Sequence, residues 1–181
     1  MERDEAWNFV CDKIESPRMR QHMLATEACM RAVASRLKQD PDMWAITGLV
    51  HDCDIEEVDG DPERHGRRAA EMLAENGLPE VVTHAVMVHP GHGERVSLLD
   101  RALWCVDPTT GFIMAAVLVI PSKKFADLKL KSIRKRMKDK RFAASVSRDQ
   151  IRGCSEIGLE LDEFLGICLE AMRDIAPQLG H

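Results

Sequence analysis

The sequence contains no tyrosine, and aromatic residues make up only 4% of its 181 positions. Its core must therefore consist mainly of Leu, Ile, Val, Ala and the ten methionines. Alternating apolar and polar runs and clusters of β-branched residues, which are typical of strands, are also scarce. These absences favour an all-α fold, and we predict a helical bundle with short connections.

Long apolar runs and an excess of positive charge are missing as well. The longest apolar run covers residues 111–120, whereas a helix that spans a membrane needs about 20 residues. The net charge of −5 argues against a protein that binds nucleic acid through its overall charge. We therefore expect neither a membrane nor a nucleic-acid partner, and the sequence leaves the oligomeric state open.

The six cysteines include no Cys-x-x-Cys pair, which argues against a structural zinc site built from thiolates. The N-terminal residues are too charged for a signal peptide. We therefore expect free thiols in a reducing environment, and a cytoplasmic protein.

Ser or Asp followed directly by Pro occurs three times, and each such pair is typical of a helix start. The pairs are Ser16-Pro17, Asp40-Pro41 and Asp61-Pro62. The predicted helices span residues 17–38, 41–52, 62–77, 79–89, 97–106, 109–119, 128–138, 148–158 and 162–179.

No repeat, low-complexity segment or linker divides the chain, so we predict one domain over residues 1–181. The segment 121–148 is polar and basic, and we expect it to form a partly exposed flap. Its basic helix is either a solvated surface helix or a lid over a polyanionic substrate or an oligonucleotide. The lack of interleaved aromatic residues that could stack on bases argues against the oligonucleotide. Residues 148–179 supply the C-terminal helices.

His51 and Asp52 stand side by side after the apolar run 44–50, at the end of a predicted helix. His22 lies beside the apolar stripe of another predicted helix, and Asp107 follows an apolar segment. Burying a carboxylate is costly unless a cation or a hydrogen-bond donor compensates its charge. Imidazole nitrogen and carboxylate oxygen are good ligands of first-row metals. These four residues are therefore a candidate metal site with two nitrogen and two oxygen ligands.

Each of the four residues also has an ordinary structural role. His22 would be a hydrogen-bonded core histidine, and His51 would interact with the dipole at the end of its helix. Asp52 would be solvated, and Asp107 would cap a helix that begins at Thr109. All of these roles would have to occur together at three helix ends or faces, which favours the metal site.

The order His…His-Asp…Asp on predicted helices resembles the HD-domain superfamily of metal-dependent phosphohydrolases. The likeness extends to the surrounding residues and covers roughly residues 18–120, the part of the chain that carries the motifs. The similar segments are Met19–Glu27, Leu49–Glu56, His65–Ala70, and Asp107 with Thr110 and Gly111. The resemblance implies a bundle of the HD-domain type, with His22, His51, Asp52 and Asp107 as the ligands of one ion.

Binuclear members of this superfamily have further His ligands after the HD pair. His65 and His89 lie at matching places, so the resemblance implies one or two ions. His84 is a weaker candidate, because it is five residues from His89 and points roughly 140° away on a helix. His92 lies in a Pro-Gly loop, where it contacts either substrate or solvent.

Two nitrogen and two carboxylate ligands suit Mn²⁺, Fe²⁺, Co²⁺, Ni²⁺ or Zn²⁺ better than Mg²⁺. Such an ion lowers the pKa of a bound water towards about 7, and Asp52 is the candidate to orient that water. Some relatives have a Glu three residues after the HD aspartate, but this chain has Ile55 there. A general acid would have to be another group, such as Asp54 or Glu56, and either of these is equally a supporting or a solvated residue.

The resemblance implies hydrolysis of a phosphomonoester or phosphodiester, often a nucleotide, as a small-molecule substrate. Arg20 is a candidate substrate contact, because it stands with Arg18 near a helix start and a guanidinium suits phosphate. Its ordinary role would be that of a solvated residue on a helix face. Arg67 and Arg68, which follow His65, are further cations near the predicted ligands.

Two other functions remain open on the sequence alone. A di-iron oxygenase on an HD scaffold would need His65 and His89, or His84, to complete a site for two irons. A non-catalytic domain that binds a ligand or regulates a partner would keep the metal for structure, and a site sealed from solvent would favour it.

Overall fold

The computed structural model describes residues 1–180, and this part of the chain is helical without any strand, which confirms the all-α prediction. The helices and the two short 3-10 helices (η) follow one another along the chain. They are α1 (Arg3–Lys13), α2 (Pro17–Arg36), α3 (Pro41–Val50), α4 (Arg67–Glu75), α5 (Glu80–Val88), α6 (Leu98–Leu118), η1 (Phe125–Asp127), α7 (Leu130–Met137), α8 (Arg148–Arg152), η2 (Gly153–Ile157) and α9 (Leu161–Asp174).

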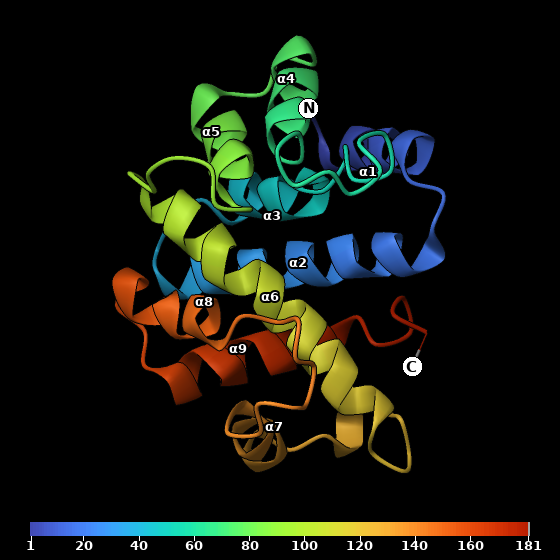
Figure 1. Cartoon of the computed structure of the whole chain (residues 1–181), viewed down its shortest axis with the longest axis vertical. Helices are drawn as coiled ribbons and strands as arrows, with labels where there is room; N and C mark the ends of the chain where they lie inside the picture. The colour runs from blue at the N-terminus through green and yellow to red at the C-terminus, as the bar shows by residue number, and fades with distance from the viewer. Residues whose placement is uncertain (181) are drawn as a thin grey trace.

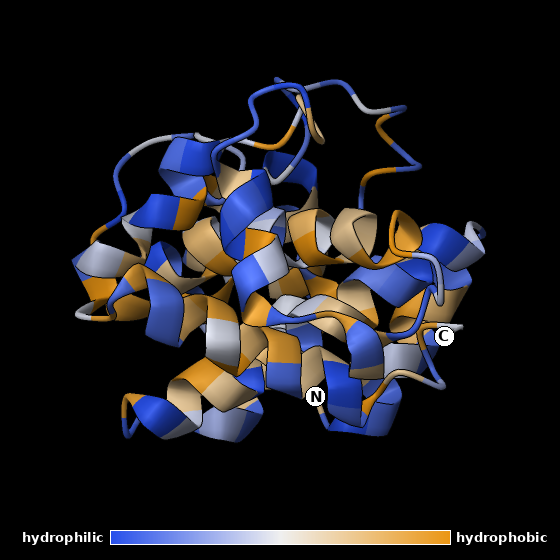
Figure 2. Cartoon of the chain, turned by 90° about the horizontal axis from the view of Figure 1, so that it is seen from below, coloured by the Kyte–Doolittle hydropathy of each residue, from blue (hydrophilic) through white to orange (hydrophobic). Residues whose placement is uncertain are grey.

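The two longest helices, α2 and α6, cross at the centre of the bundle (Figure 1). Helix α2 packs against α3 on one side and α9 on the other, while α4 and α5 pair with each other and α5 contacts α6. Helix α7 packs against α9 at the end of the molecule opposite α4 (Figure 1). Apolar residues gather between the helices, and hydrophilic residues predominate on the outward faces (Figure 2), as hydrophobic burial requires.

Two of the three predicted helix starts are confirmed. The Ser16 hydroxyl accepts a hydrogen bond from the N–H of Met19, and the Asp40 carboxylate accepts from the N–H groups of Asp42 and Met43. The prediction that Asp61-Pro62 opens a helix was wrong, because residues 61–66 form turns and α4 begins only after them.

Two features explain why α4 begins at Arg67 and not at residue 62, where we predicted it. Gly66, its N-terminal flanking residue, has a φ of +78°, which a side chain would strain, and a Cβ there would lie 2.7 Å from a ring carbon of Pro90. The carboxylate of Asp54 accepts hydrogen bonds from the N–H groups of Gly66 and Ala69 and so caps the helix from twelve residues away. A cap so distant in the sequence leaves no signal beside the helix it caps.

The two helices predicted over residues 97–106 and 109–119 are one continuous helix, α6, with Pro108 inside it. Proline removes one N–H from the helical ladder, which usually ends or kinks a helix. The helix nevertheless continues, and beside the proline the hydroxyls of Thr109 and Thr110 donate to the carbonyls of Cys105 and Asp107. Asp107 therefore lies in the middle of a helix and does not cap one.

The ends of the chain also differ from the prediction. Helix α1 was not predicted, and it docks on α2 through Arg3, whose guanidinium donates two hydrogen bonds to the buried Glu27 carboxylate. The helix predicted over 148–158 is split into α8 and the 3-10 helix η2. The last predicted helix ends at Asp174 and is followed by turns.

The basic segment 121–148 lies against the bundle with its apolar side chains. Phe125, Leu128 and Ile133 are buried, and Arg173 of α9 donates to the carbonyls of Phe125 and Leu128. Most of its basic side chains are exposed, and Arg134 pairs with Asp162. Arg148 turns inward, where its guanidinium donates to the carbonyls of Ala143 and Val146. Of the helices in residues 1–180, none combines the length and the apolar character needed to cross a membrane.

Helices α2 and α3 approach so closely at Gly48 that no side chain fits between them. A Cβ at this position would lie 2.8 Å from the carbonyl oxygen of Thr26 and 2.9 Å from Cγ of Met30. The close contact brings the two helices that carry His22 and His51 together.

We predict that Gly48→Ala destabilises the fold, although alanine is the better helix former. The clash with the backbone of α2 should lower the free energy of unfolding by about 1–3 kcal/mol, measured by urea denaturation. The control is Gly166→Ala in α9, where a Cβ meets no atom within 4 Å. That change should stabilise by about 0.5–1 kcal/mol, and equal effects of both substitutions would contradict the close contact.

Candidate metal centre

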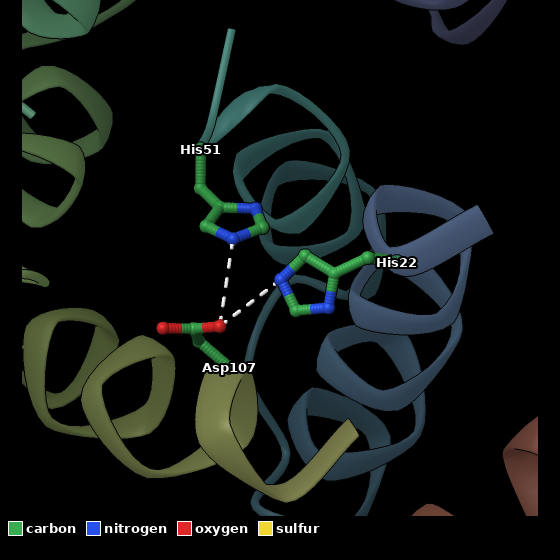
Figure 3. Close-up of side chains that lie close together, drawn as sticks. All are labelled: His22, His51 and Asp107. Carbon is green, nitrogen blue, oxygen red and sulfur yellow. Dashed lines mark ion pairs between the residues drawn. The ribbon is translucent and has the colours of Figure 1, made fainter. Parts of the chain in front are cut away.

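Two histidines and an aspartate from three helices meet at the centre of the bundle. His22 is in α2, His51 follows directly after α3, and Asp107 is in the middle of α6. One carboxylate oxygen of Asp107 lies 3.1 Å from Nε2 of His22 and 3.8 Å from Nε2 of His51 (Figure 3). The ligand atoms of these three residues are close enough together to hold one metal ion.

Asp52 joins this group to a second one. Its Oδ2 lies 3.6 Å from Nε2 of His22, and its Oδ1 lies 3.2 Å from Nε2 of both His51 and His89. Nε2 of His65 lies 3.4 Å from the same Oδ1. His51, Asp52 and His89 form another set that could hold an ion. The structure thus brings all six predicted ligands into one cluster, with Asp52 at its centre.

The positions of His51 and His89 at helix ends determine which ring nitrogen faces the cluster. At the end of α3 and of α5, the last carbonyl groups have no N–H partner within the helix. Nδ1 of His51 lies 2.8 Å from the carbonyl of Gly48, and Nδ1 of His89 lies 2.6 Å from the carbonyl of Val86. A carbonyl only accepts, so each Nδ1 donates a proton, and Nε2, which faces the cluster, is the nitrogen that a metal could bind.

The other two imidazoles are held in the same orientation by side chains. The Thr110 hydroxyl donates to the carbonyl of Asp107 and therefore accepts from Nδ1 of His22, 3.1 Å away. Nδ1 of His65 lies 2.8 Å from Oδ1 of Asp54, which accepts its proton. Such hydrogen bonds from Nδ1, the ring nitrogen that faces away from the cluster, fix the ring and direct Nε2 towards a metal.

The electrostatics of the cluster favour a cation between its ligands. Nε2 of His51 is buried and has no hydrogen-bond partner within residues 1–180. Burial lowers the pKa of the His51 imidazole, but the carboxylates of Asp52 and Asp107 outweigh burial and raise it well above its ordinary value. Burial raises the pKa of the Asp107 carboxyl, but the imidazoles of His22 and His51 outweigh burial and lower it. The buried His/Asp groups therefore fit a divalent metal, which would take the place of a proton between them.

A cleft of about 320 Å³ connects the cluster with the surface between α2 and α6. It is lined by Arg18, Met19, His22, Asp52, Gly111, Met114, Ala115 and Leu118. The guanidinium of Arg18 makes no ion pair or hydrogen bond with any other described residue. The guanidinium of Arg20, the predicted substrate contact, points elsewhere and donates to the carbonyls of Ile14 and Cys11. The structure thus places Arg18 in the cleft and Arg20 at the junction of α1 and α2.

The two acidic residues considered as general acids have other partners. Asp54 is fully buried, and its carboxylate accepts from His65 and from two N–H groups at the start of α4. The Glu56 carboxylate accepts from the N–H groups of Glu15 and Ser16, which lowers its pKa. The structure therefore places Asp54 behind His65, which it orients, and places Glu56 at the start of α2.

The weaker histidine candidates lie outside the cluster. Nδ1 of His84 lies 3.1 Å from a carboxylate oxygen of Asp100, at the start of α6. Nε2 of His92 donates to the carbonyl of His65, 3.0 Å away, and so holds the turn that carries His65.

Sequence reasoning did not identify the role of Thr110 as the residue that orients His22. A signal was present, because Thr110 follows Asp107 by three residues, and residues at this spacing lie on the same face of a helix. It also did not identify the apolar residues of the cleft, which are unremarkable members of helical stripes in the sequence.

Comparison with known proteins agrees with this geometry. The model of the HD domain family matches residues 19–108, a range that contains all six residues of the cluster. No curated protein and no solved structure matches the chain significantly. Both the matched range and the His/Asp cluster within it show that the chain belongs to the HD-domain superfamily, which is a superfamily of metal-dependent phosphohydrolases.

Proposed function

We propose that this protein is a metal-dependent phosphohydrolase that cleaves a phosphomonoester or phosphodiester. The observation that supports this most is the opening of the cleft onto His22 and Asp52, beside the cation of Arg18. A phosphate in the cleft would meet the metal ligands at one end and a guanidinium on its wall. We expect the ion to be Mn²⁺, Fe²⁺, Co²⁺, Ni²⁺ or Zn²⁺, because the ligands combine imidazole nitrogen with carboxylate oxygen.

A bound ion would supply charge to polarise the phosphoryl group and to lower the pKa of a water molecule. The residues of the chain have separate tasks. Asp52 faces the cleft and the imidazoles at once, and it would orient the attacking water, which releases a proton to solvent in the cleft. The water oxygen forms the new bond to phosphorus while the bond from phosphorus to the leaving oxygen breaks, and the leaving oxygen gains a proton from solvent in the cleft. Arg18 would hold the phosphate during this exchange.

A di-iron oxygenase is the second candidate, and the observation that favours it is the position of His65 and His89 beside Asp52. These residues complete a ligand set for two ions. Two irons per purified chain, together with oxygen consumption, would support this function. A purely structural metal is less favoured, because the cleft exposes the cluster to solvent.

We predict that the purified protein hydrolyses phosphoesters after loading with Mn²⁺, Co²⁺ or Ni²⁺. Asp52→Asn should lower kcat/KM roughly 100-fold or more, because the cluster loses the carboxylate at its centre. Asp42→Asn is a matched control, since Asp42 is an exposed residue paired with Arg31. An inactive wild type on nucleotides and generic phosphoesters with every metal would refute the proposal.

We predict that Thr110→Val weakens metal binding about 10- to 100-fold, because Nδ1 of His22 loses its acceptor. Isothermal titration calorimetry with Zn²⁺ or Mn²⁺ measures this directly. Thr109→Val is the matched control, since Thr109 is also buried in α6 and bonds only to the carbonyl of Cys105. Equal metal affinities of the two variants would show that Thr110 does not position the ligand.

A further inference from the structure

The cleft has two chemically different parts. His22 and Asp52 form its inner end, and Arg18 is the one other charged residue in its lining. The rest of the lining comes from one turn of α2 and one face of α6 and consists of Met19, Gly111, Met114, Ala115 and Leu118. The four α6 residues lie on the same face as Asp107, at spacings of four, seven, eight and eleven residues. The apolar wall therefore begins directly beside the metal ligands.

This wall limits what the cleft can recognise. Its side chains are those of Met, Ala and Leu, which offer no donor and, apart from the weakly accepting Met sulfur, no acceptor to a sugar hydroxyl or the edge of a base. It contains no aromatic ring on which a base could stack. Leu118, at its outer end, is 46% exposed, so the wall leaves apolar surface that a ligand could cover. The volume of about 320 Å³ is near the lower limit for small-molecule sites.

Gly111 is the residue in this wall that the fold does not explain. Glycine inside a helix costs about 1 kcal/mol relative to alanine. At Gly48 the close approach of α2 accounts for that cost, but a Cβ at Gly111 would meet no atom within 4 Å. The space in front of Gly111 is part of the cleft, one helical turn from Asp107. The missing side chain therefore widens the cleft next to the metal ligands.

We infer that the substrate is a phosphomonoester of a small apolar alcohol, and that Gly111 determines how large its organic group can be. The inference rests on the proposed function and narrows its substrate class. The phosphate lies at His22, Asp52 and Arg18, and the organic group lies over Gly111 against Met114. Nucleotides and sugar phosphates are poor substrates, because the wall offers their polar groups no partner.

The experiment compares ethyl, butyl and hexyl phosphate with glucose 6-phosphate and AMP, using the metal-loaded enzyme. In the wild type, kcat/KM should rise about fourfold for each added methylene that the wall covers, and the two polar substrates should fall below butyl phosphate. In Gly111→Leu, the ratio of kcat/KM for hexyl phosphate to that for ethyl phosphate should fall at least tenfold. A wild type that prefers glucose 6-phosphate or AMP, or an unchanged ratio in Gly111→Leu, would overturn the inference.

Gly166→Leu is the matched control, because Gly166 is also a helical glycine that faces open space, in a groove between α2 and α9. This variant should keep the wild-type ratio. Metal content and the melting temperature of Gly111→Leu show whether the cluster and the fold survive the substitution. If that variant does not fold, Met114→Gln replaces it, and this polar change in the wall should lower the same ratio severalfold.

Binding of alkylphosphonates, which cannot be hydrolysed, separates this inference from the proposed function. Calorimetry on the metal-loaded protein should show that hexylphosphonate binds at least tenfold more tightly than methylphosphonate, and that Gly111→Leu removes the difference. If this binding pattern appears but no ester is hydrolysed, the hydrolase proposal fails. The cleft is then a binding site for alkyl phosphates, and the inference about its ligand class holds. If esters are hydrolysed without dependence on chain length, the inference alone fails.

Discussion

The carboxylate of Asp52 lies among imidazoles from four segments of the chain, and much of the bundle serves to hold them there. Nδ1 of each imidazole has its own acceptor, which is a carbonyl at a helix end, the hydroxyl of Thr110 or the carboxylate of Asp54. A buried carboxylate is unfavourable unless a cation compensates its charge. The fold therefore maintains an arrangement that a bound metal would stabilise, which is typical of a site selected for binding and not for stability.

The parts of the site that the sequence predicted are those with local signals. The helix ends at His51 and His89 follow from apolar runs and the breaks after them, and the structure confirms both positions. The role of Asp54 has no local signal, because this residue caps α4 and orients His65 from eleven or more residues away. The predicted start of α4 was wrong for the same reason. A long-range hydrogen bond decided the local structure, and the residues around Asp61 contain no trace of it.

Arg18 and Arg20 illustrate a different limit of prediction from the sequence. Both lie in the first turns of α2, and of the two we predicted Arg20 as the contact to an anionic substrate. Two residues along a helix are about 200° apart, so one of them faces the cleft only if the other turns away. Which one does so depends on the end of α1, because the carbonyls of Cys11 and Ile14 hold the guanidinium of Arg20 on that side. Because α1 was not predicted, the contact that turns Arg20 away from the cleft could not be foreseen.

Gly48 and Gly111 are both interior helical glycines, and nothing in their sequence neighbourhoods tells them apart. At Gly48 the missing side chain lets protein approach, since the backbone of α2 occupies the space. At Gly111 no protein atom occupies it, although α6 would be more stable with alanine there. Gly111 therefore lowers the stability of α6 and leaves open space in the cleft beside the buried His/Asp cluster. That volume opens onto an apolar wall, so the shape of the cleft argues for an organic group with little polarity next to the phosphate.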